Sequence, residues 1–281
     1  MNIIQAIILG IIQGLTEFLP ISSTAHLTLG GKLMGLISSA NPEQWTAFMA
    51  TIQLGTMIAV VLYFLDEIKL VSMAFFKENL GTGKLSFKTQ SNESKLGWMI
   101  IIGSIPIFTI GYLLKKIIEG NLTKSLSVIA GSLIIVALIL FIAEKVASMK
   151  KDIRDITLKD SIIIGLFQCI ALIPGSSRSG STIMGGLFMG LKRETAARFS
   201  FLLSIPAVLA SGLYEFYKSY HYLTSSDMAV LLISTVVAGI TGYLAIAFLL
   251  NYLKTRTTNI FVIYRILLGI VIFFLIFKGI V

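Results

Sequence analysis

Long apolar runs, separated by short polar segments, follow one another along most of this 281-residue chain. A helix needs about 20 predominantly apolar residues to cross a bilayer. Six of the runs reach that length, so we predict six membrane-spanning helices. They are expected at about 47–65, 97–114, 126–144, 197–217, 229–250 and 260–277. The long interruption at 66–96 is polar and carries five lysines, and we expect it to form a loop outside the bilayer.

Two further apolar stretches are interrupted before they reach that length. Residues 3–12 and 21–36 are separated by a polar segment that contains Pro20, and the stretch 161–191 is broken in the same way at Pro174. Irregular backbone at membrane depth is tolerated only where it is buried in protein or lines a polar cavity. We therefore expect each stretch to be a re-entrant helix pair.

This order of broken stretch and spans occurs twice along the chain. The matches are Phe48 and Tyr63 with Phe199 and Tyr214, ILGIIQ (8–13) with IIGLFQ (163–168), and PISST (20–24) with PGSSR (174–178). Chance similarity between apolar helices is the alternative explanation. We predict an internal duplication, with repeats at about 1–145 and 156–281, inside a single integral membrane domain that covers 1–281. Three spans per repeat would make the second repeat inverted in topology, as in many transporters.

Composition agrees with a polytopic, all-α membrane protein. The chain is 56% hydrophobic and 13% charged, whereas a soluble domain is about 25% charged. The single cysteine, Cys169, excludes an internal disulfide and a zinc site made of several thiolates.

The net charge of +9 would suggest nucleic-acid binding in a soluble protein. Here most Lys and Arg residues lie in four segments between apolar runs, all on one side of the predicted topology: 66–96, 145–160, 192–198 and 251–259. Positively charged loops are retained in the cytoplasm. We therefore expect the charge to orient the chain in the membrane, with both termini outside, and we expect membrane lipids rather than nucleic acid as partners.

The first broken stretch, QGLTEFLPISSTAHL (13–27), is unusually polar for its surroundings. It contains Gln13, Glu17, Ser22, Ser23, Thr24 and His26. An ionisable side chain inside a membrane costs about 2.5–3.5 kcal/mol on insertion scales, so it usually faces a cavity and has a partner. Gln13 and Glu17 are four residues apart and share one face of a helix. Ser22 or Thr24 could instead serve as a cap for the helix that follows Pro20.

The second broken stretch, QCIALIPGSSRSGSTI (168–183), combines a guanidinium with several hydroxyls. Arg178 is surrounded by Ser176, Ser177, Ser179 and Thr182. Backbone N–H groups at a helix start, hydroxyl donors and a guanidinium together suit a phosphate. The stretch lacks the lysine and the spacing of a nucleotide-binding P-loop, so that site is rejected. A structural ion pair between Arg178 and Glu17 is the alternative role for the arginine.

Together, the polar residues of both stretches fit phosphoryl transfer or hydrolysis. Arg178 and the helix N-termini would neutralise phosphate charge. A serine or a histidine would attack, and Glu17 or His26 would move the proton. A lipid-phosphate flippase or transporter could use the same groups for binding alone. No cluster of His, Asp and Glu has the spacing of a closed metal site.

Other polar residues of the apolar runs are given structural roles. Gln53 is expected to be a packing contact between helices. Glu144, Lys145 and Arg265 are expected near span ends, where long side chains reach towards the polar interface. His221 is expected in an interfacial loop beside two tyrosines.

The motifs QGLTEFLPISSTAH and PGSSRSGST resemble the two signatures of the undecaprenyl-pyrophosphate phosphatase family, also called the bacitracin-resistance protein family, and the resemblance runs the full length. It implies hydrolysis of undecaprenyl diphosphate to undecaprenyl phosphate and inorganic phosphate in the bacterial cell membrane. That reaction recycles the lipid carrier for cell-wall synthesis, and overproduction of the enzyme confers bacitracin resistance.

The resemblance also implies roles for individual residues. Glu17, Ser23, His26 and Arg178 match the catalytic core, and Gln13, Ser22, Ser177 and Thr182 match supporting groups. We expect Thr24, Ser176 and Ser179 to bind substrate as well. Gln13 stands where many members have a glutamate, which shifts the acid–base role to Glu17. A divalent cation, Mg²⁺ or Ca²⁺, is implied, held mainly by diphosphate oxygens, Glu17 and water.

Overall fold

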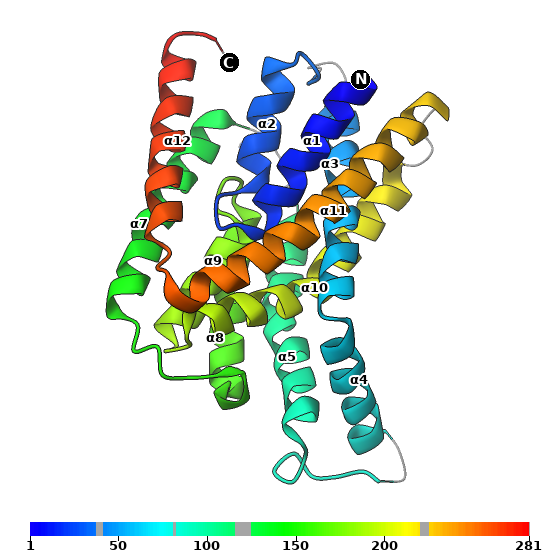
Figure 1. Ribbon diagram of the computed structural model, residues 1–281, viewed down its shortest axis with the longest axis vertical. Helices are drawn as coiled ribbons and strands as arrows, with labels where there is room; N and C mark the ends of the chain where they lie inside the picture. Colours follow the sequence, from blue (N-terminus) through cyan, green and yellow to red (C-terminus); the bar gives the residue numbers. More distant parts are fainter. Residues whose placement is uncertain (38–41, 81–82, 116–124, 220–224, 281) are drawn as a thin grey trace.

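The computed structural model describes residues 1–37, 42–80, 83–115, 125–219 and 225–280, and the regular structure of these residues is helical. The helices are α1 (Ile3–Phe18), α2 (Ser23–Leu33), α3 (Pro42–Tyr63), α4 (Leu65–Asn79), α5 (Asn92–Leu113), α7 (Leu126–Val146), α8 (Leu158–Cys169), α9 (Arg178–Phe188), α10 (Arg193–Ser219), α11 (Ser225–Thr255) and α12 (Asn259–Phe277), arranged as in Figure 1. Within this part of the chain, α3, α5, α7, α10, α11 and α12 are long and apolar enough to cross a membrane. The six predicted spans are thus confirmed as six long apolar helices.

The expected loop at 66–96 is wrong, because most of this segment is helical. It begins with α4, whose first turn carries Asp66 and Glu67 and whose last turn carries Lys77, the charge order that the helix dipole favours. Glu67 Oε2 accepts hydrogen bonds from Arg198 Nε at 2.9 Å and Arg198 Nη2 at 2.8 Å. This ion pair fastens α4 to α10. The helix α4 projects at one end of the molecule, beside the lower part of α5 (Figure 1).

The two broken stretches are helical hairpins, α1 with α2 and α8 with α9 (Figure 1). The first helix is longer than the predicted 3–12, because α1 continues through Gly14 to Phe18. A Cβ at Gly14 would lie 1.9 Å from Thr241 Oγ1, so glycine here lets α1 approach α11 closely without ending the helix. The helix ends at Leu19, which precedes Pro20 and is extended, as a residue before proline prefers.

The turns of the two hairpins have the same backbone geometry. Ser22 (φ 75°) precedes α2 and Ser177 (φ 67°) precedes α9, and both following helices have 11 residues. Gly35 and Gly190 then follow these helices with φ values of 66° and 83°. Non-glycine residues adopt positive φ rarely. The positive φ of both Ser22 and Ser177, directly before helices of equal length, therefore supports a structural relation between the hairpins.

This geometry changes the residue pairing of the two motifs. It pairs Ser22 with Ser177, and therefore Ser23 with Arg178. The alignment of PISST with PGSSR in the sequence is shifted by one residue from this pairing. Sequence identity at the prolines suggested the shifted alignment, whereas the backbone conformation decides the pairing in space.

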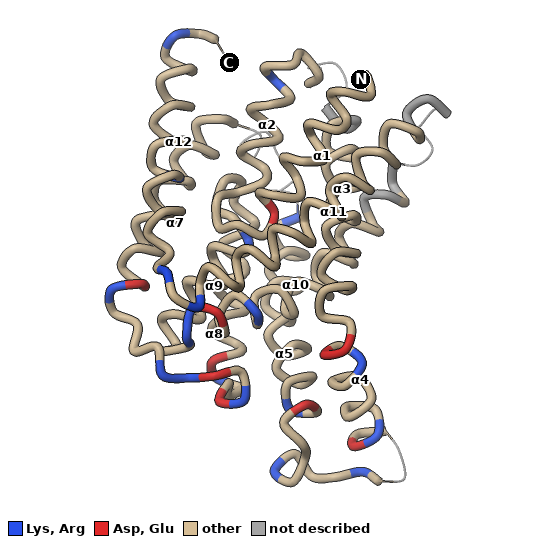
Figure 2. The backbone as a smooth tube through the Cα atoms, in the orientation of Figure 1, with Lys and Arg blue, Asp and Glu red and all other residues tan. Residues whose placement is uncertain are grey.

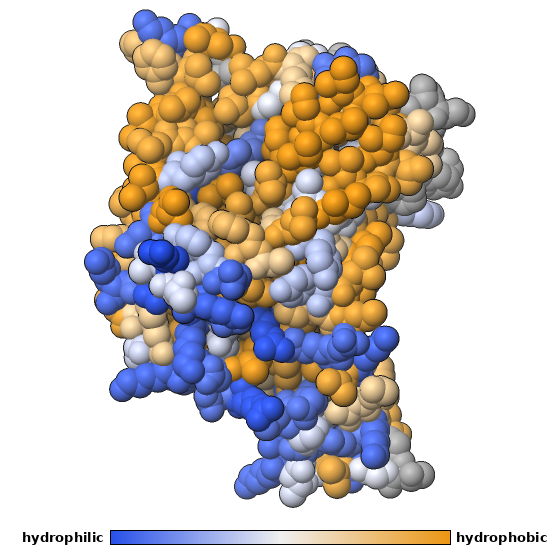
Figure 3. Space-filling model, in the orientation of Figure 1, coloured by the Kyte–Doolittle hydropathy of each residue, from blue (hydrophilic) through white to orange (hydrophobic). Residues whose placement is uncertain are grey.

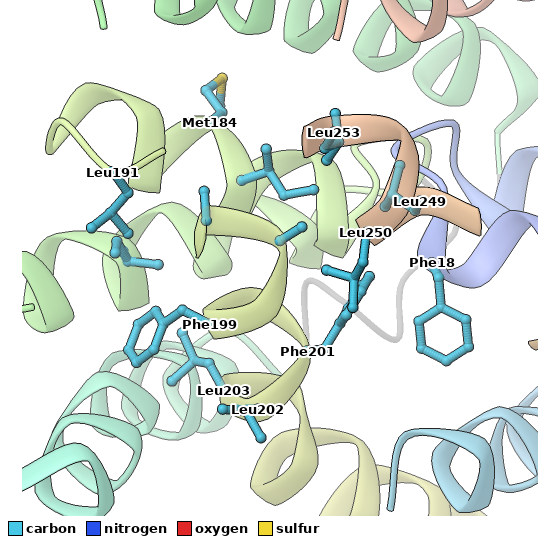
Figure 4. Close-up of a cluster of buried hydrophobic side chains, with 14 of the residues drawn as sticks. Phe18, Met184, Leu191, Phe199, Phe201, Leu202, Leu203, Leu249, Leu250 and Leu253 are labelled. Carbon is cyan, nitrogen blue, oxygen red and sulfur yellow. The ribbon is translucent and has the colours of Figure 1, made fainter. Parts of the chain in front are cut away.

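A cluster of buried apolar side chains packs the hairpins against the long helices. Figure 4 shows Phe18 of α1 beside side chains of α10 and α11, and Met184 of α9 belongs to the same cluster on its far side. The rings of Phe18 and Phe201 contact edge to face, with 5.3 Å between centroids. Because Phe18 follows Glu17 directly, this packing also fixes where the carboxylate can lie.

Arg265 of α12 is completely buried and connects both hairpin turns. Its Nη1 donates to Pro20 O at 3.2 Å, and its Nη2 donates to Gly175 O at 3.2 Å and to Ser176 O at 2.9 Å. Its Nε donates to Leu133 O at 3.2 Å. The predicted interfacial position of Arg265 is wrong, because the interrupted backbone of both turns offers it carbonyl acceptors in the interior.

Glu144 lies near the end of α7, as predicted, but its side chain is buried and does not reach outwards. It accepts a hydrogen bond from Arg193 Nε at 2.6 Å and another from Thr258 Oγ1 at 2.9 Å. Its neighbour Lys145 is exposed as expected, with Nζ 5.3 Å from the centroid of the Phe141 ring. His221 lies outside the described residues.

Charged residues are distributed unevenly along the molecule. Figure 2 shows Lys and Arg concentrated in the lower half of the view, around α8 and along α4 and the lower part of α5, while the two chain termini lie at the upper end. Figure 3 shows hydrophobic side chains over α1, α11 and α12 and hydrophilic ones at the end rich in Lys and Arg. This arrangement separates a basic end from an apolar body.

We predict that Arg265→Met lowers the free energy of unfolding by about 3 kcal/mol or more. Each buried polar group that loses its partner costs about 1–3 kcal/mol, and Arg265 serves four carbonyls. Thermal unfolding of the purified protein in detergent measures the loss. The matched control is Lys145→Met, which removes an exposed cation and should change stability by less than about 0.5 kcal/mol. Equal unfolding of both variants would contradict the prediction.

Candidate active site

Glu17 lies at the centre of a hydrogen-bonded cluster and is only 7% exposed. Its Oε1 accepts from Arg178 Nη2 at 2.8 Å and from Gln53 Nε2 at 3.1 Å. Its Oε2 accepts from Ser23 Oγ at 2.7 Å and from Gln13 Nε2 at 3.1 Å. Two carboxylate oxygens offer about four acceptor directions, so these four donors satisfy the carboxylate fully.

Four helices bring these side chains together. Gln13 and Glu17 lie one turn apart on α1, as their spacing predicted, and Gln53 reaches them from α3. Ser23 and Arg178 are the first residues of α2 and α9. The predicted meeting of the two broken stretches is confirmed by the ion pair between Glu17 and Arg178.

Sequence reasoning missed Gln53, which was expected to be a packing contact. Its only sequence signal was a long polar side chain inside a predicted span. In an apolar span, periodicity alone does not reveal which face carries a functional contact. The hydrogen bond from Gln53 Nε2 to Glu17 Oε1 shows that this face points into the site.

A cavity of about 490 Å³ lies beside the ion pair. Its polar wall is formed by Glu17, Ser22, Ser23, Thr24, Gln53, Gln168, Ser177 and Arg178. Its apolar wall includes Ile107 and Phe108 of α5, Leu172, and Ala207 and Val208 of α10. The cavity therefore offers hydrogen-bond donors on one side and hydrocarbon on the other.

The serines before α2 and α9 act as helix caps. Ser22 Oγ accepts from Ala25 N at 3.3 Å, and Ser177 Oγ accepts from Gly180 N at 3.2 Å. The capping role considered for Ser22 is thus confirmed. Because Ser22 and Ser177 also line the cavity, both helices begin at its wall. The positive ends of two helix dipoles there favour an anion.

His26 is held away from this cavity. Its Nδ1 lies 2.7 Å from Ser22 O, which can only accept, so Nδ1 carries the proton. Its Nε2 lies 2.6 Å from the hydroxyl of Tyr264, from which it accepts in the neutral imidazole, and the two rings stack at an interplanar angle of 3°. Among the described residues, those that line the cavity do not include His26.

Three other predicted substrate-binding residues lie behind the cavity wall. Ser176 is fully buried and is held through its carbonyl by Arg265, and Ser179 Oγ donates to Leu19 O at 3.3 Å. Thr182 Oγ1 donates within its own helix and lies 2.5 Å from Ser200 Oγ. Contact of these three residues with a substrate stays a prediction, whereas Thr24 already lines the cavity.

The donor set does not fit a divalent cation held by the protein alone. Across the part of the chain that the structure describes, no three His, Cys, Asp or Glu side chains are grouped to hold a metal ion. Glu17 is the one carboxylate on the described cavity wall, and its acceptor directions are already used by four donors. A hard cation such as Mg²⁺ would need several more oxygen ligands.

The chain is similar to known proteins over nearly its whole length. Residues 6–271 match the model of the family described as bacitracin resistance protein BacA. A relative from Syntrophobacter fumaroxidans named undecaprenyl-diphosphatase is 54% identical over 278 residues, covering 99% of each chain. A protein of the same name from Prosthecochloris aestuarii is 50% identical, and the match covers 99% of each chain. Another, from Chlorobaculum tepidum, is also 50% identical, and the match covers 96% of this chain and 95% of the relative. A match of this length and identity means that the chain belongs to the bacitracin resistance protein BacA family.

Proposed function

We propose that this chain hydrolyses undecaprenyl diphosphate to undecaprenyl phosphate and inorganic phosphate. The observation that carries the proposal is the hydrogen bond between Ser23 and Glu17, beside Arg178, at the wall of a cavity with one polar and one apolar side. Full-length relatives that share about half of the residues are named for this activity. A lipid-phosphate transporter, the alternative from the sequence, is favoured by no separate observation.

The two sides of the cavity suit the two parts of the substrate. The diphosphate would lie against the polar wall, where Arg178 and the N-termini of α2 and α9 offer positive charge. The isoprenoid chain would leave along the apolar side chains of α5 and α10, such as Phe108 and Val208. Tyr112 at the α5 edge of the cavity is 80% exposed, so this side opens to the surroundings of the protein.

Ser23 is the nucleophile in this proposal. Its hydroxyl already donates to Glu17 Oε2 at 2.7 Å, within the reach of a general base. Ser23 Oγ would attack the terminal phosphorus while its proton passes to Glu17. The bond from that phosphorus to the bridging oxygen breaks, and undecaprenyl phosphate leaves. Water then attacks the phosphoserine while Glu17 returns its proton to the departing Ser23 oxygen, so that inorganic phosphate leaves and both the Ser23 hydroxyl and the Glu17 carboxylate are restored.

The resting ion pair is part of this mechanism. Arg178 Nη2 lies 2.8 Å from Glu17 Oε1. A diphosphate carries more negative charge than one carboxylate, so it would attract Arg178 away from Glu17. Glu17 would then lose a strong donor and become a better proton acceptor. Substrate binding would thereby prepare the base for the reaction.

His26 is proposed as a positioning residue, not as the nucleophile. Its Nδ1–H holds the carbonyl of Ser22, whose backbone has positive φ, and Ser23 follows directly. Tyr264 occupies the other ring nitrogen, so a direct attack by His26 would require this contact to break.

A divalent cation is proposed only as part of the substrate complex. Diphosphate oxygens and water would supply most of its ligands, since the protein offers Glu17 alone at the cavity. When bound, Mg²⁺ or Ca²⁺ would supply further positive charge to the phosphates.

We also propose the finer topology that the sequence predicts. The two hairpins would be re-entrant pairs in inverted repeats, with both termini outside the cell membrane and the basic end in the cytoplasm. The separation of the basic end from the termini supports this orientation (Figure 2).

We predict that Ser23→Ala lowers kcat by at least about 1000-fold, because the nucleophile is lost. Phosphate release from undecaprenyl diphosphate by purified protein in detergent gives the rate. His26→Gln should retain measurable turnover and should still form a phosphoserine that acid quenching traps. Trapping of phosphate on His26, or full activity of Ser23→Ala, would refute the assignment.

Chelation of divalent cations should slow phosphate release, and added Mg²⁺ or Ca²⁺ should restore it. Without substrate, titration calorimetry of the protein with either cation should detect no binding tighter than about 1 mM, because Glu17 is surrounded by donors. Tight binding to the substrate-free protein would show a site that the described residues do not form.

The topology is tested by labelling single cysteines in a Cys169→Ser background. Lys278→Cys, near the C-terminus, should react with a membrane-impermeant maleimide in intact cells, whereas Lys88→Cys at the basic end should react only after lysis. The reverse pattern would place the termini in the cytoplasm.

A further inference from the structure

Gln168 of α8 is a buried polar side chain without a partner. It is 0% exposed, and within the described part of the chain neither its Nε2 nor its Oε1 has a hydrogen-bond partner. Buried polar side-chain atoms are paired in the large majority of cases, and an unpaired one lowers stability. A side chain that binds a ligand is one physical reason to keep such a group.

Its position connects it with the proposed reaction. Gln168 belongs to the wall of the cavity that Glu17 and Arg178 also line. The Nε of Arg178 is likewise buried without a partner, while its Nη2 pairs with Glu17. Two residues of the second hairpin that line the cavity therefore each carry a buried N–H donor without an acceptor, and both donors would suit an anion.

The relation between the two hairpins explains why Gln168 has no acceptor. In the pairing set by Ser22 and Ser177, Gln168 corresponds to Gln13. Gln13 Nε2 donates to the carboxylate of Glu17, one turn further along the helix. The residue in that place in the second hairpin is Leu172, which also lines the cavity. The carboxylate that satisfies the first glutamine is thus replaced by hydrocarbon.

We propose that Gln168 binds a phosphate group of the substrate. Its Nε2–H would donate to a diphosphate oxygen, which takes the place that the Glu17 carboxylate has for Gln13. Rotation of the flexible side chain would turn the amide into the cavity when the lipid enters. This inference rests on the proposed function, since it needs the diphosphate in this cavity.

The test is Gln168→Met, which keeps the side-chain length and removes both polar atoms. A hydrogen bond to a charged group corresponds to about a tenfold to hundredfold change, so kcat/KM for undecaprenyl diphosphate should fall by that factor, mainly through KM. The melting temperature without substrate should stay equal or rise, because an unpaired buried amide is removed. A glutamine with only a structural role would give the opposite change in stability.

Binding without turnover gives a second measurement. The non-hydrolysable methylene-diphosphonate analogue of the substrate should raise the melting temperature of the wild type clearly and that of Gln168→Met much less. Gln168→Glu should lose more kcat/KM than Gln168→Met, because a carboxylate repels the diphosphate. The matched control is Cys169→Ser, the next residue on α8, whose thiol donates within its own helix and which does not line the described cavity. It should behave like the wild type.

Arg178→Met and Ser23→Ala, measured in parallel, separate the two possible failures. If both lose activity while Gln168→Met keeps wild-type kcat/KM and an unchanged analogue shift, the role of Gln168 is overturned and the proposed site stands. If both keep activity, the reaction lies elsewhere and both proposals fall. A lower melting temperature of Gln168→Met with an unchanged analogue shift would also overturn the proposal, in favour of a structural role.

Discussion

The packing of the two hairpins depends on hydrogen-bond partners for the backbone carbonyls at their turns, which lie inside an apolar body. Two helical hairpins turn at Pro20 and Pro174, and their carbonyls cannot pair within a helix there. In a bilayer interior such groups need protein partners. Arg265 provides them from α12, donating to carbonyls of both turns while it is completely buried. One guanidinium thereby holds the two turns beside each other, and the polar cluster around Glu17 forms next to them.

That cluster is balanced in charge while no substrate is bound. Glu17 and Arg178 neutralise each other, and neutral donors such as Ser23 and Gln53 satisfy the remaining acceptor directions. Breaking a buried pair is costly when a charge is left alone. In the proposed mechanism, a diphosphate that enters the cavity would offer Arg178 a replacement partner, so the site would exchange one anion for another without leaving the guanidinium unpaired.

The differences between the hairpins explain their division of roles. The backbone conformation is repeated, with capping serines at Ser22 and Ser177. The next residue is Ser23, the proposed nucleophile, in one hairpin and the cation Arg178 in the other. The first hairpin keeps its own carboxylate, whereas the second has Leu172 at the corresponding place. In the proposed mechanism, the first hairpin thus supplies a base with its nucleophile, and the second supplies a surface that suits an anion.

The sequence by itself determined the six apolar spans, the breaks at the two prolines and the unusual polarity around Glu17 and Arg178, because length, proline and charge act locally. The ion pair between Glu17 and Arg178 was considered only as an alternative to phosphate binding by Arg178, and the tertiary structure shows that it forms. The sequence missed Gln53 and misplaced Arg265, because in a nearly uniform apolar helix neither periodicity nor composition tells which face meets protein. It also missed α4, since its polar composition resembled a loop. Which side chains reach one carboxylate depends on how distant helices pack, and only the folded chain establishes that.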